Sequence, residues 1–128
     1  MIKFRTWDNE NETYLYDVQK AYDMFSGTVK YADGEDANYE ECCFGDFLSN
    51  RRYDVEQFTG LKDVNGKEIY ENDLVRLTDD LEDPIYKVIF DEAKFEIIGG
   101  GVCYDLGEEF MDCEVIGNVH ENPELLKG

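Results

Sequence analysis

Hydrophobic and polar residues alternate with a period of two along several short segments of this chain. In residues 2–7, Ile2 and Phe4 fall on one face of an extended segment, and the charged residues beside them fall on the other. A polar run at residues 8–12 separates this segment from residues 13–18, which are rich in Tyr and have strand composition. This pattern predicts an antiparallel β-hairpin at the N-terminus.

Segments with strand composition recur along the rest of the chain, and turn-forming residues separate them. We predict strands at residues 28–31, 53–59, 68–70, 74–77, 86–90, 94–98 and 114–119, and an extended conformation at residues 102–104. The brief helical spacing at residues 18–25 predicts either one helical turn or an irregular bridge. Asn122 as N-cap and Pro123 at the first helical position predict a C-terminal helical turn. We expect Leu125 and Leu126 to pack back onto the sheet.

Three turn regions stand out between these segments. Asn65-Gly66 suits a type I′ hairpin turn. The triple glycine at residues 99–101 predicts a turn or bulge rather than a phosphate-binding loop, because no Gly-Lys-Ser/Thr follows it. Residues 78–84 predict a surface excursion, because Pro84 cannot donate to a β-ladder and the neighbouring carboxylates resist burial.

These elements predict a mainly β fold. Many short antiparallel strands with little room for crossover helices favour a small SH3-like or related barrel, with an added N-terminal hairpin and a short C-terminal helical turn. The segment 67–119 alone has the size of such a barrel. We expect one domain over residues 1–128, with the hairpin and an acidic loop region at 1–57 and the barrel-like part at 58–128.

The charge of the chain is strongly negative, with 31 Asp and Glu against 12 Lys and Arg and a formal net charge of -19. Residues 32–50 contain six carboxylates and no cation; we predict a mobile loop there, or alternatively a solvated face of an ordered element. Because only Arg51 and Arg52 are adjacent cations, ordinary nucleic-acid binding is disfavoured. The acidity favours solubility, and also suits competition for a basic surface on a partner.

The four cysteines do not have the spacing of a redox pair or of paired zinc knuckles. We therefore expect reduced thiols in a cytoplasmic protein, with no cofactor. The alternative is a zinc site that uses His120, the only histidine, and three of the four cysteines. The four are Cys42, Cys43, Cys103 and Cys113. No run of about 18 apolar residues is present, so we expect no membrane span.

Three stretches of the chain, residues 2–8, 58–75 and 115–126, together resemble the YopX family of phage and prophage proteins. The resemblance implies a β-rich fold with a barrel-like part, a bacterial cytoplasm, and a homo-oligomer as one option, and it brings no established activity. Asn72 stands where the family usually has Gly, which suggests a turn with positive φ. His120 stands where an aromatic residue is common.

No catalytic constellation is evident, because carboxylates are abundant but none is singled out; Asp91 and Glu92, for example, would face opposite sides of a strand. We therefore predict a non-enzymatic phage accessory protein that binds an unknown protein partner. A candidate recognition edge comprises Lys62, Lys67, Glu68 and Tyr70. The alternative interpretation of this segment is architectural, with Asp63 and Asp73 accepting hydrogen bonds from backbone N–H groups.

Two alternative functions involve nucleic acid. The first is an acidic mimic whose carboxylates imitate phosphates and occupy a DNA-binding protein. The second is direct nucleic-acid binding, which requires a local basic stripe built from Lys3, Arg5, Arg51 and Arg52.

Overall fold

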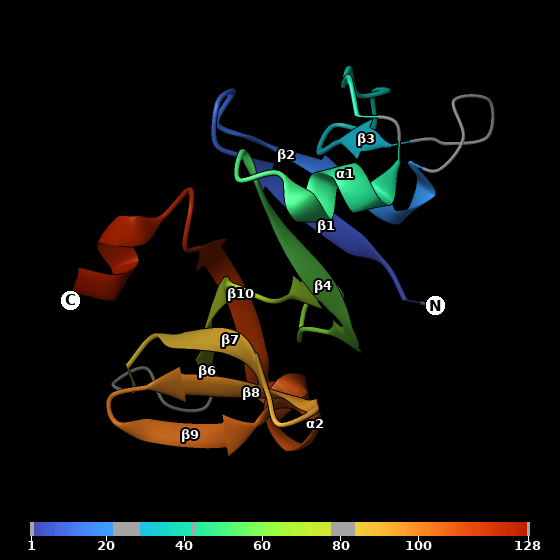
Figure 1. Cartoon of the computed structure of the whole chain (residues 1–128). Helices are drawn as coiled ribbons and strands as arrows, with labels where there is room; N and C mark the ends of the chain where they lie inside the picture. The colour runs from blue at the N-terminus through green and yellow to red at the C-terminus, as the bar shows by residue number, and fades with distance from the viewer. Residues whose placement is uncertain (1, 22–28, 42, 78–83, 128) are drawn as a thin grey trace. The chain divides into compact units, whose positions relative to one another are not determined.

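The computed structural model describes residues 2–21, 29–41, 43–77 and 84–127 (Figure 1). The chain divides into two compact units, Met1–Gln57 and Phe58–Gly128. Both units are built mainly from antiparallel strands, as the sequence predicts.

The first unit is a sheet with the strand order β3-β2-β1-β4, to which short helices are added. Its elements are β1 Phe4–Asp8, β2 Thr13–Tyr16, the 3-10 helix η1 Val18–Lys20, β3 Lys30–Tyr31, α1 Phe44–Ser49 and the first part of β4 Tyr53–Lys62. Thr6 of β1 lies opposite Leu15 of β2 and Val55 of β4. The predicted hairpin is confirmed. Of the predicted turn or bridge at residues 18–25, η1 is present and residues 22–28 lie outside the described residues.

The acidic segment between β3 and β4 contains more regular structure than the predicted mobile loop. Lys30 forms an isolated β-bridge with Asp36, and Ala37 N donates a hydrogen bond of 2.9 Å to Val29 O. Helix α1 then buries Phe47 completely against the first unit's core. Of the six carboxylates of this segment, Asp36 lies in the β-bridge and Asp46 in α1, so the alternative interpretation, an ordered element, holds for part of it. The helix itself was not predicted, because its apolar residues span less than two turns.

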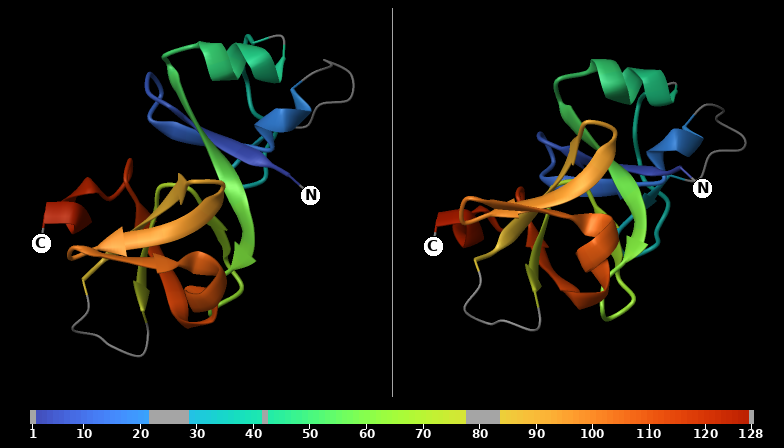
Figure 2. Two further views of the ribbon diagram at one scale, coloured as in Figure 1. Left: turned by 60° about the horizontal axis from the view of Figure 1, so that its bottom comes forward. Right: turned by 90° about the horizontal axis from the view of Figure 1, so that it is seen from below.

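The second unit is an open antiparallel sheet with the strand order β10-β6-β7-β8-β9 (Figures 1 and 2). Its elements are β5 Glu68–Tyr70, β6 Asp73–Leu77, β7 Tyr86–Asp91, β8 Lys94–Gly99, β9 Val102–Asp105, α2 Leu106–Glu109, η2 Phe110–Asp112, β10 Cys113–Asn118 and η3 Pro123–Lys127. Strand β4 continues into this unit, where Phe58 lies opposite Tyr70 of β5. The core includes Val75, Val88 and Ile97, all fully buried.

The predicted closure into a barrel is wrong for the described strands, because β10 and β9 stand at opposite ends of the sheet order and do not pair. The outer edge of β10 is instead occupied by the turn after β4, where Val64 N donates a hydrogen bond of 2.9 Å to Cys113 O. Strand β9 leads directly into α2, so the chain leaves the sheet before it can turn toward β10. The more specific likeness to an SH3 barrel stays a prediction.

The type I′ conformation is found at a different hairpin turn from the one that the sequence predicts. Gly66 has a φ of 83°, but Asn65 is not among the residues with positive φ, so the predicted type I′ turn at Asn65-Gly66 is wrong, although the chain reverses there. The β7–β8 turn instead has Glu92 at 50° and Ala93 at 67°, which is the pattern of a type I′ turn. The positive φ predicted for Asn72 is confirmed at 68°.

The triple glycine forms the β8–β9 turn, as predicted, and residues 102–104 are extended within β9. The C-terminal helical turn is confirmed as the 3-10 helix η3. The side chain of Asn122 accepts a hydrogen bond of 3.1 Å from Asn118 N, which ties the start of η3 to the end of β10. Helices α2 and η2 were not predicted, and most of the predicted excursion at residues 78–84 lies outside the described residues.

Candidate functional site: a pocket on the second sheet

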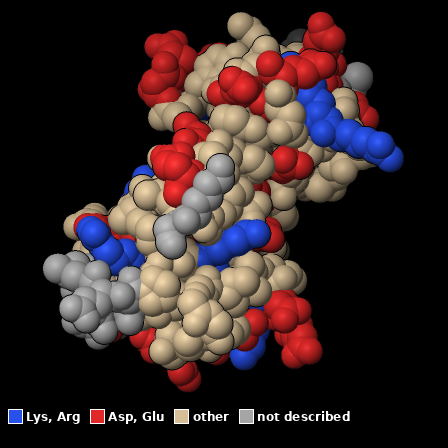
Figure 3. Space-filling model, turned by 90° about the vertical axis from the view of Figure 1, so that its left-hand side faces the viewer, with Lys and Arg blue, Asp and Glu red and all other residues tan. Residues whose placement is uncertain are grey.

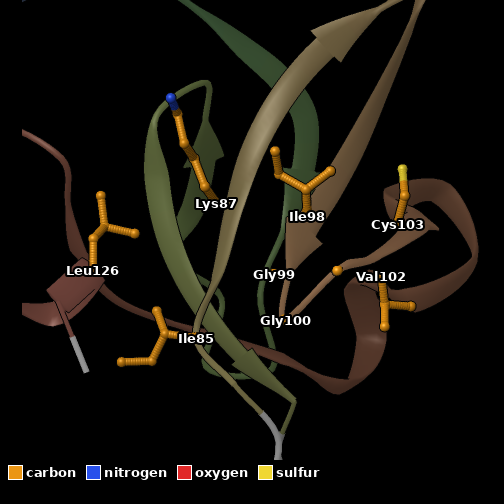
Figure 4. Close-up of a pocket in the computed structure, with 9 residues that line it drawn as sticks. Ile85, Lys87, Ile98, Gly99, Gly100, Val102, Cys103 and Leu126 are labelled. Carbon is orange, nitrogen blue, oxygen red and sulfur yellow. The ribbon is translucent and has the colours of Figure 1, made fainter.

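One row of side chains crosses three neighbouring strands on the outer face of the second sheet. Lys87 of β7 lies opposite Ile98 of β8, and Ile98 lies opposite Cys103 of β9. Figure 4 shows these three side chains pointing to the same side of the sheet. Because side chains alternate along a strand, the neighbouring Val88 and Ile97 point the other way and are buried in the core. The strand period thus fixes which side chains face outward.

These residues belong to a surface pocket with a volume of about 510 Å³, which we call the Lys87 pocket. It is lined by Ile85, Lys87, Ile98, Gly99, Gly100, Gly101, Val102, Cys103 and Leu126. Ile98, Val102 and Leu126 are 37%, 42% and 49% exposed. Ligand pockets typically combine such apolar surface with a few polar groups and have volumes of about 300–1,000 Å³. The Lys87 pocket is therefore the candidate binding site of the second unit.

The wall formed by the β8–β9 turn depends on glycine. A Cβ atom at Gly99 would lie 2.6 Å from Ile85 O, and one at Gly100 would lie 2.7 Å from Pro84 Cγ. Gly100 also has a φ of 57°, in the left-handed region that side chains disfavour. This part of the pocket therefore consists of bare backbone packed closely against residues 84–85.

Among the described residues that line the pocket, Lys87 is the only charged one and none is acidic, although 31 of the 128 residues of the chain are Asp or Glu. Within the described residues Lys87 has no ion-pair partner. Lys94 offers a contrast, because its Nζ lies 3.5 Å from Glu96 and 4.0 Å from Asp105. Glu96 first, and then Asp105, raise the pKa of Lys94.

The cysteines do not make this pocket a reactive site. Burial and the neighbouring Glu96 raise the pKa of the exposed Cys103 thiol, which lowers the fraction of nucleophilic thiolate at neutral pH. Burial, followed by Glu109 and Asp112, raises the pKa of Cys113 to about 12. Cys43, Cys103 and Cys113 are free thiols, and the described part of the chain contains no group of three potential metal ligands. The arrangement at the pocket suits binding rather than covalent chemistry.

The predicted recognition edge is distributed over one hairpin. Lys62 of β4 lies opposite Glu68 of β5, and Lys67 is exposed in the turn between them. Tyr70 is only 4% exposed, with its ring centroid 5.4 Å from that of Phe58. Three of the four residues thus contribute to the surface, and a recognition role for them stays a prediction.

The predicted architectural roles of Asp63 and Asp73 are confirmed. Asp63 Oδ1 accepts hydrogen bonds from Asn65 N at 2.9 Å and Lys67 N at 2.8 Å, as in an Asx-type turn. Asp73 Oδ2 accepts one from Tyr70 N at 2.8 Å. Neither carboxylate faces the Lys87 pocket.

The cations considered for direct nucleic-acid binding are largely engaged in structure. Arg5 is buried and its Nε donates a hydrogen bond of 2.8 Å to Glu56, while the Arg52 guanidinium pairs with Asp8 at 2.8 Å. Arg51 is exposed. On the face drawn in Figure 3, uncharged areas and small groups of Lys and Arg interrupt the carboxylates, so the acidic side chains do not form one continuous array on that face.

The sequence did not single out the Lys87 pocket. Two of its residues could have been found from the sequence: Lys87 and Ile98 are outward positions of two strands that were predicted correctly, and Ile85 directly precedes the first of them. The sequence does not predict that Leu126 lines the pocket, because this depends on how the chain turns between β10 and η3.

The two antiparallel sheets define a mainly β protein with few helices. No helix in the described ranges is long and apolar enough to cross a bilayer. The chain belongs to the YopX family, because the family model described as YopX protein matches residues 3–127.

Similar proteins agree with this assignment. The SPbeta prophage-derived uncharacterized protein YopX of Bacillus subtilis (strain 168) is 34% identical over 73 residues, which cover 51% of this chain and 54% of that protein. The match thus spans about half the length of this curated relative. The crystal structure of protein EF1440 from Enterococcus faecalis is 27% identical, with a TM-score of 0.64 and 98% of both chains covered. The crystal structure of protein yopX from Bacillus subtilis, 20% identical with a TM-score of 0.53 and 97% of both chains covered, shows the same fold.

Proposed function

We propose that this chain is a non-enzymatic interaction module of a phage or prophage, acting in the cytoplasm of a bacterial host, and that the Lys87 pocket binds a segment of its protein partner. One observation carries the proposal: Ile98, Val102 and Leu126 are exposed around a pocket that has no carboxylate among its described lining residues. Exposed apolar side chains that gather at one place mark interaction sites more often than scattered ones do. The prophage origin of the Bacillus subtilis relative supports the setting.

The test is capture of partners from host cells that carry the phage, with the wild-type chain and two variants as bait. Ile98→Asp places a carboxylate in the pocket, whereas Met111→Asp changes a side chain that is 71% exposed and does not line it. We expect a saturable partner that binds the wild type and Met111→Asp and is lost with Ile98→Asp. Far-UV circular dichroism and thermal unfolding check that both variants are folded. Equal recovery by all three baits would contradict the proposal.

The acidic mimic is the competing function, and the net charge of -19 is the observation that favours it. A mimic binds a DNA-binding protein through many screened charges, so its affinity falls steeply with salt. It is also expected to be insensitive to Ile98→Asp, which adds one more carboxylate. Binding through the Lys87 pocket has the opposite signature, with weak salt dependence and strong sensitivity to Ile98→Asp.

The homo-oligomer also stays a proposal. Strand β9 is the last strand of the second sheet, and an uncovered edge of this kind can pair with a second copy. Light scattering at several concentrations tests this, because a mass above the 14.9 kDa of one chain is expected if copies associate.

A further inference from the structure

We propose that the Lys87 pocket recognises an extended partner segment in which an apolar side chain and a carboxylate lie on the same face. The inference rests on the proposed function and specifies the chemistry of the partner. In this arrangement the apolar side chain packs on Ile98 and Leu126, and the carboxylate accepts hydrogen bonds from Lys87 Nζ.

The ammonium group of Lys87 is the polar feature of the pocket. Two lysines of the chain pair with its own carboxylates, Lys30 with Asp36 and Lys94 with Glu96. Lys87 pairs with no carboxylate in the described ranges, and its side chain is half-buried. Figure 4 shows the Lys87 side chain extending from β7 on the same side of the sheet as Ile98. An ammonium group without an internal ion pair can form a charge-assisted hydrogen bond with an anionic group of a partner.

The surroundings of Lys87 give the second requirement. Ile98 is its cross-strand neighbour, and Leu126 lies on its other side in the same pocket. Water that contacts these exposed side chains is released when an apolar side chain covers them, which stabilises a complex. A carboxylate alone would leave this surface uncovered, so the partner must offer both groups close together.

The local charge decides between an acidic and a basic partner segment. The net charge of the whole chain attracts cations, but exposed charges beyond about 10 Å are largely screened at moderate salt. Among the described lining residues the only charge is that of Lys87, which repels a partner ammonium at short range, and the neighbouring Glu96 is paired with Lys94. In an extended segment, residues i and i+2 share a face and are about 7 Å apart, whereas the neighbouring strands of Lys87 and Ile98 are about 4.8 Å apart. The long, flexible lysine side chain can span the difference. The expected motif is therefore an apolar residue followed two positions later by Asp or Glu.

The experiment uses the full chain and three synthetic peptides. The probe is N-acetyl-Ser-Leu-Thr-Glu-Leu-Ser-amide, and the controls have Gln or Lys in place of Glu. Binding is followed by changes in the ¹⁵N–¹H NMR spectrum of the protein. We expect the Glu peptide to shift the backbone amide signals of residues 99–103 and to bind about fivefold more tightly than the Gln peptide.

Variants of the protein complete a double-mutant cycle. Lys87→Met is expected to remove the difference between the Glu and Gln peptides, whereas Lys87→Arg is expected to keep it. Lys62→Met removes an exposed lysine outside the pocket and is expected to leave the difference unchanged. The dispersion of the amide signals shows that each variant is folded.

Three results would overturn the inference: no shifts at residues 99–103 with any peptide, equal binding of the Glu and Gln peptides, or tighter binding of the Lys peptide. These failures are distinguishable from failure of the proposed function. If Ile98→Asp still abolishes partner capture while the peptides show no preference for Glu, the pocket binds a partner of other chemistry and only the carboxylate assignment falls.

Discussion

Asp63 accepts a hydrogen bond of 2.9 Å from the backbone N–H of Val115, a residue 52 positions further along the chain. The same carboxylate also accepts from the backbone of the β4–β5 turn, at Asn65 and Lys67. One buried side chain therefore holds the turn in shape and attaches it to β10.

Replacing Asp63 should destabilise the second unit more than replacing an exposed aspartate in a turn. Asp63→Ala leaves the backbone N–H groups of Asn65, Lys67 and Val115 without their acceptor, and we expect a loss of about 3 kcal/mol in the free energy of unfolding. Asp33→Ala is the matched control, because exposed Asp33 accepts from Glu35 N alone, and it should cost less than about 1 kcal/mol. Urea unfolding measures both. Equal costs would contradict the special role of Asp63.

Two threonines offer a pair of opposite predictions. Thr6 is fully buried, and within the described residues its hydroxyl has no hydrogen-bond partner. Thr6→Val should therefore stabilise the protein by about 1 kcal/mol, since it removes an unsatisfied polar atom and keeps the shape of the side chain. Thr59 donates a hydrogen bond of 2.7 Å to Ile69 O, so Thr59→Val should destabilise it by about 1 kcal/mol. Thermal unfolding of the two variants should give shifts of opposite sign.

The β7–β8 turn carries backbone strain that a substitution can relieve. Glu92 and Ala93 both have positive φ, where Asn and Gly are favoured. The double substitution Glu92→Asn and Ala93→Gly should raise the free energy of unfolding by about 1 kcal/mol. Gly66→Ala tests the same principle in reverse, because Gly66 has a φ of 83° and open space around it. That variant should lose stability; a gain would contradict the link between positive φ and stability in these turns.

The Asp8–Arg52 pair should make stability depend on acid pH. Burial raises the pKa of Asp8, but hydrogen bonds from Arg52 and from the N–H groups of Glu10 and Asn11 outweigh it, and the net pKa lies below the ordinary value. Because the pKa of the folded state is depressed, the stabilisation is complete above about pH 4 and is lost as the pH falls through the folded-state pKa.

Arg52→Met should lower the free energy of unfolding at pH 7, because it leaves the buried Asp8 carboxylate without its cation. It should also flatten the loss of stability below pH 4, because Asp8 then titrates nearer its ordinary value. Urea midpoints between pH 3 and pH 7 test this. Arg51→Met is the control, since Arg51 is exposed and its removal should leave the pH profile unchanged.

The elements that the sequence predicts best are those determined by neighbours along the chain. The β1–β2 and β7–β8 hairpins follow from local alternation, and the positive φ of Asn72 follows from residue type. The barrel prediction failed because closure depends on distant pairing: the turn at Val64 takes the edge of β10 that β9 would have needed. Helix α1 was missed because Phe44 and Phe47 give too short a helical pattern within an acidic segment.

At the candidate site, too, local features could be predicted from the sequence and long-range contacts could not. The outward orientation of Lys87 and Ile98 follows from strand period, but neither the missing partner of Lys87 nor the proximity of Leu126 can be read from the sequence. Both depend on contacts between segments about forty residues apart. The link from Asp63 to β10 escaped prediction for the same reason, although its role in the turn did not.

The close packing of Gly99 and Gly100 also limits how this protein can diversify. No side chain fits at either position without displacing the backbone of Ile85 or the ring of Pro84. The side chains of Lys87, Ile98 and Leu126 face open space and carry no comparable constraint. The surface of the pocket can therefore vary at these three side chains, while the glycine turn beside them is held constant by its own sterics.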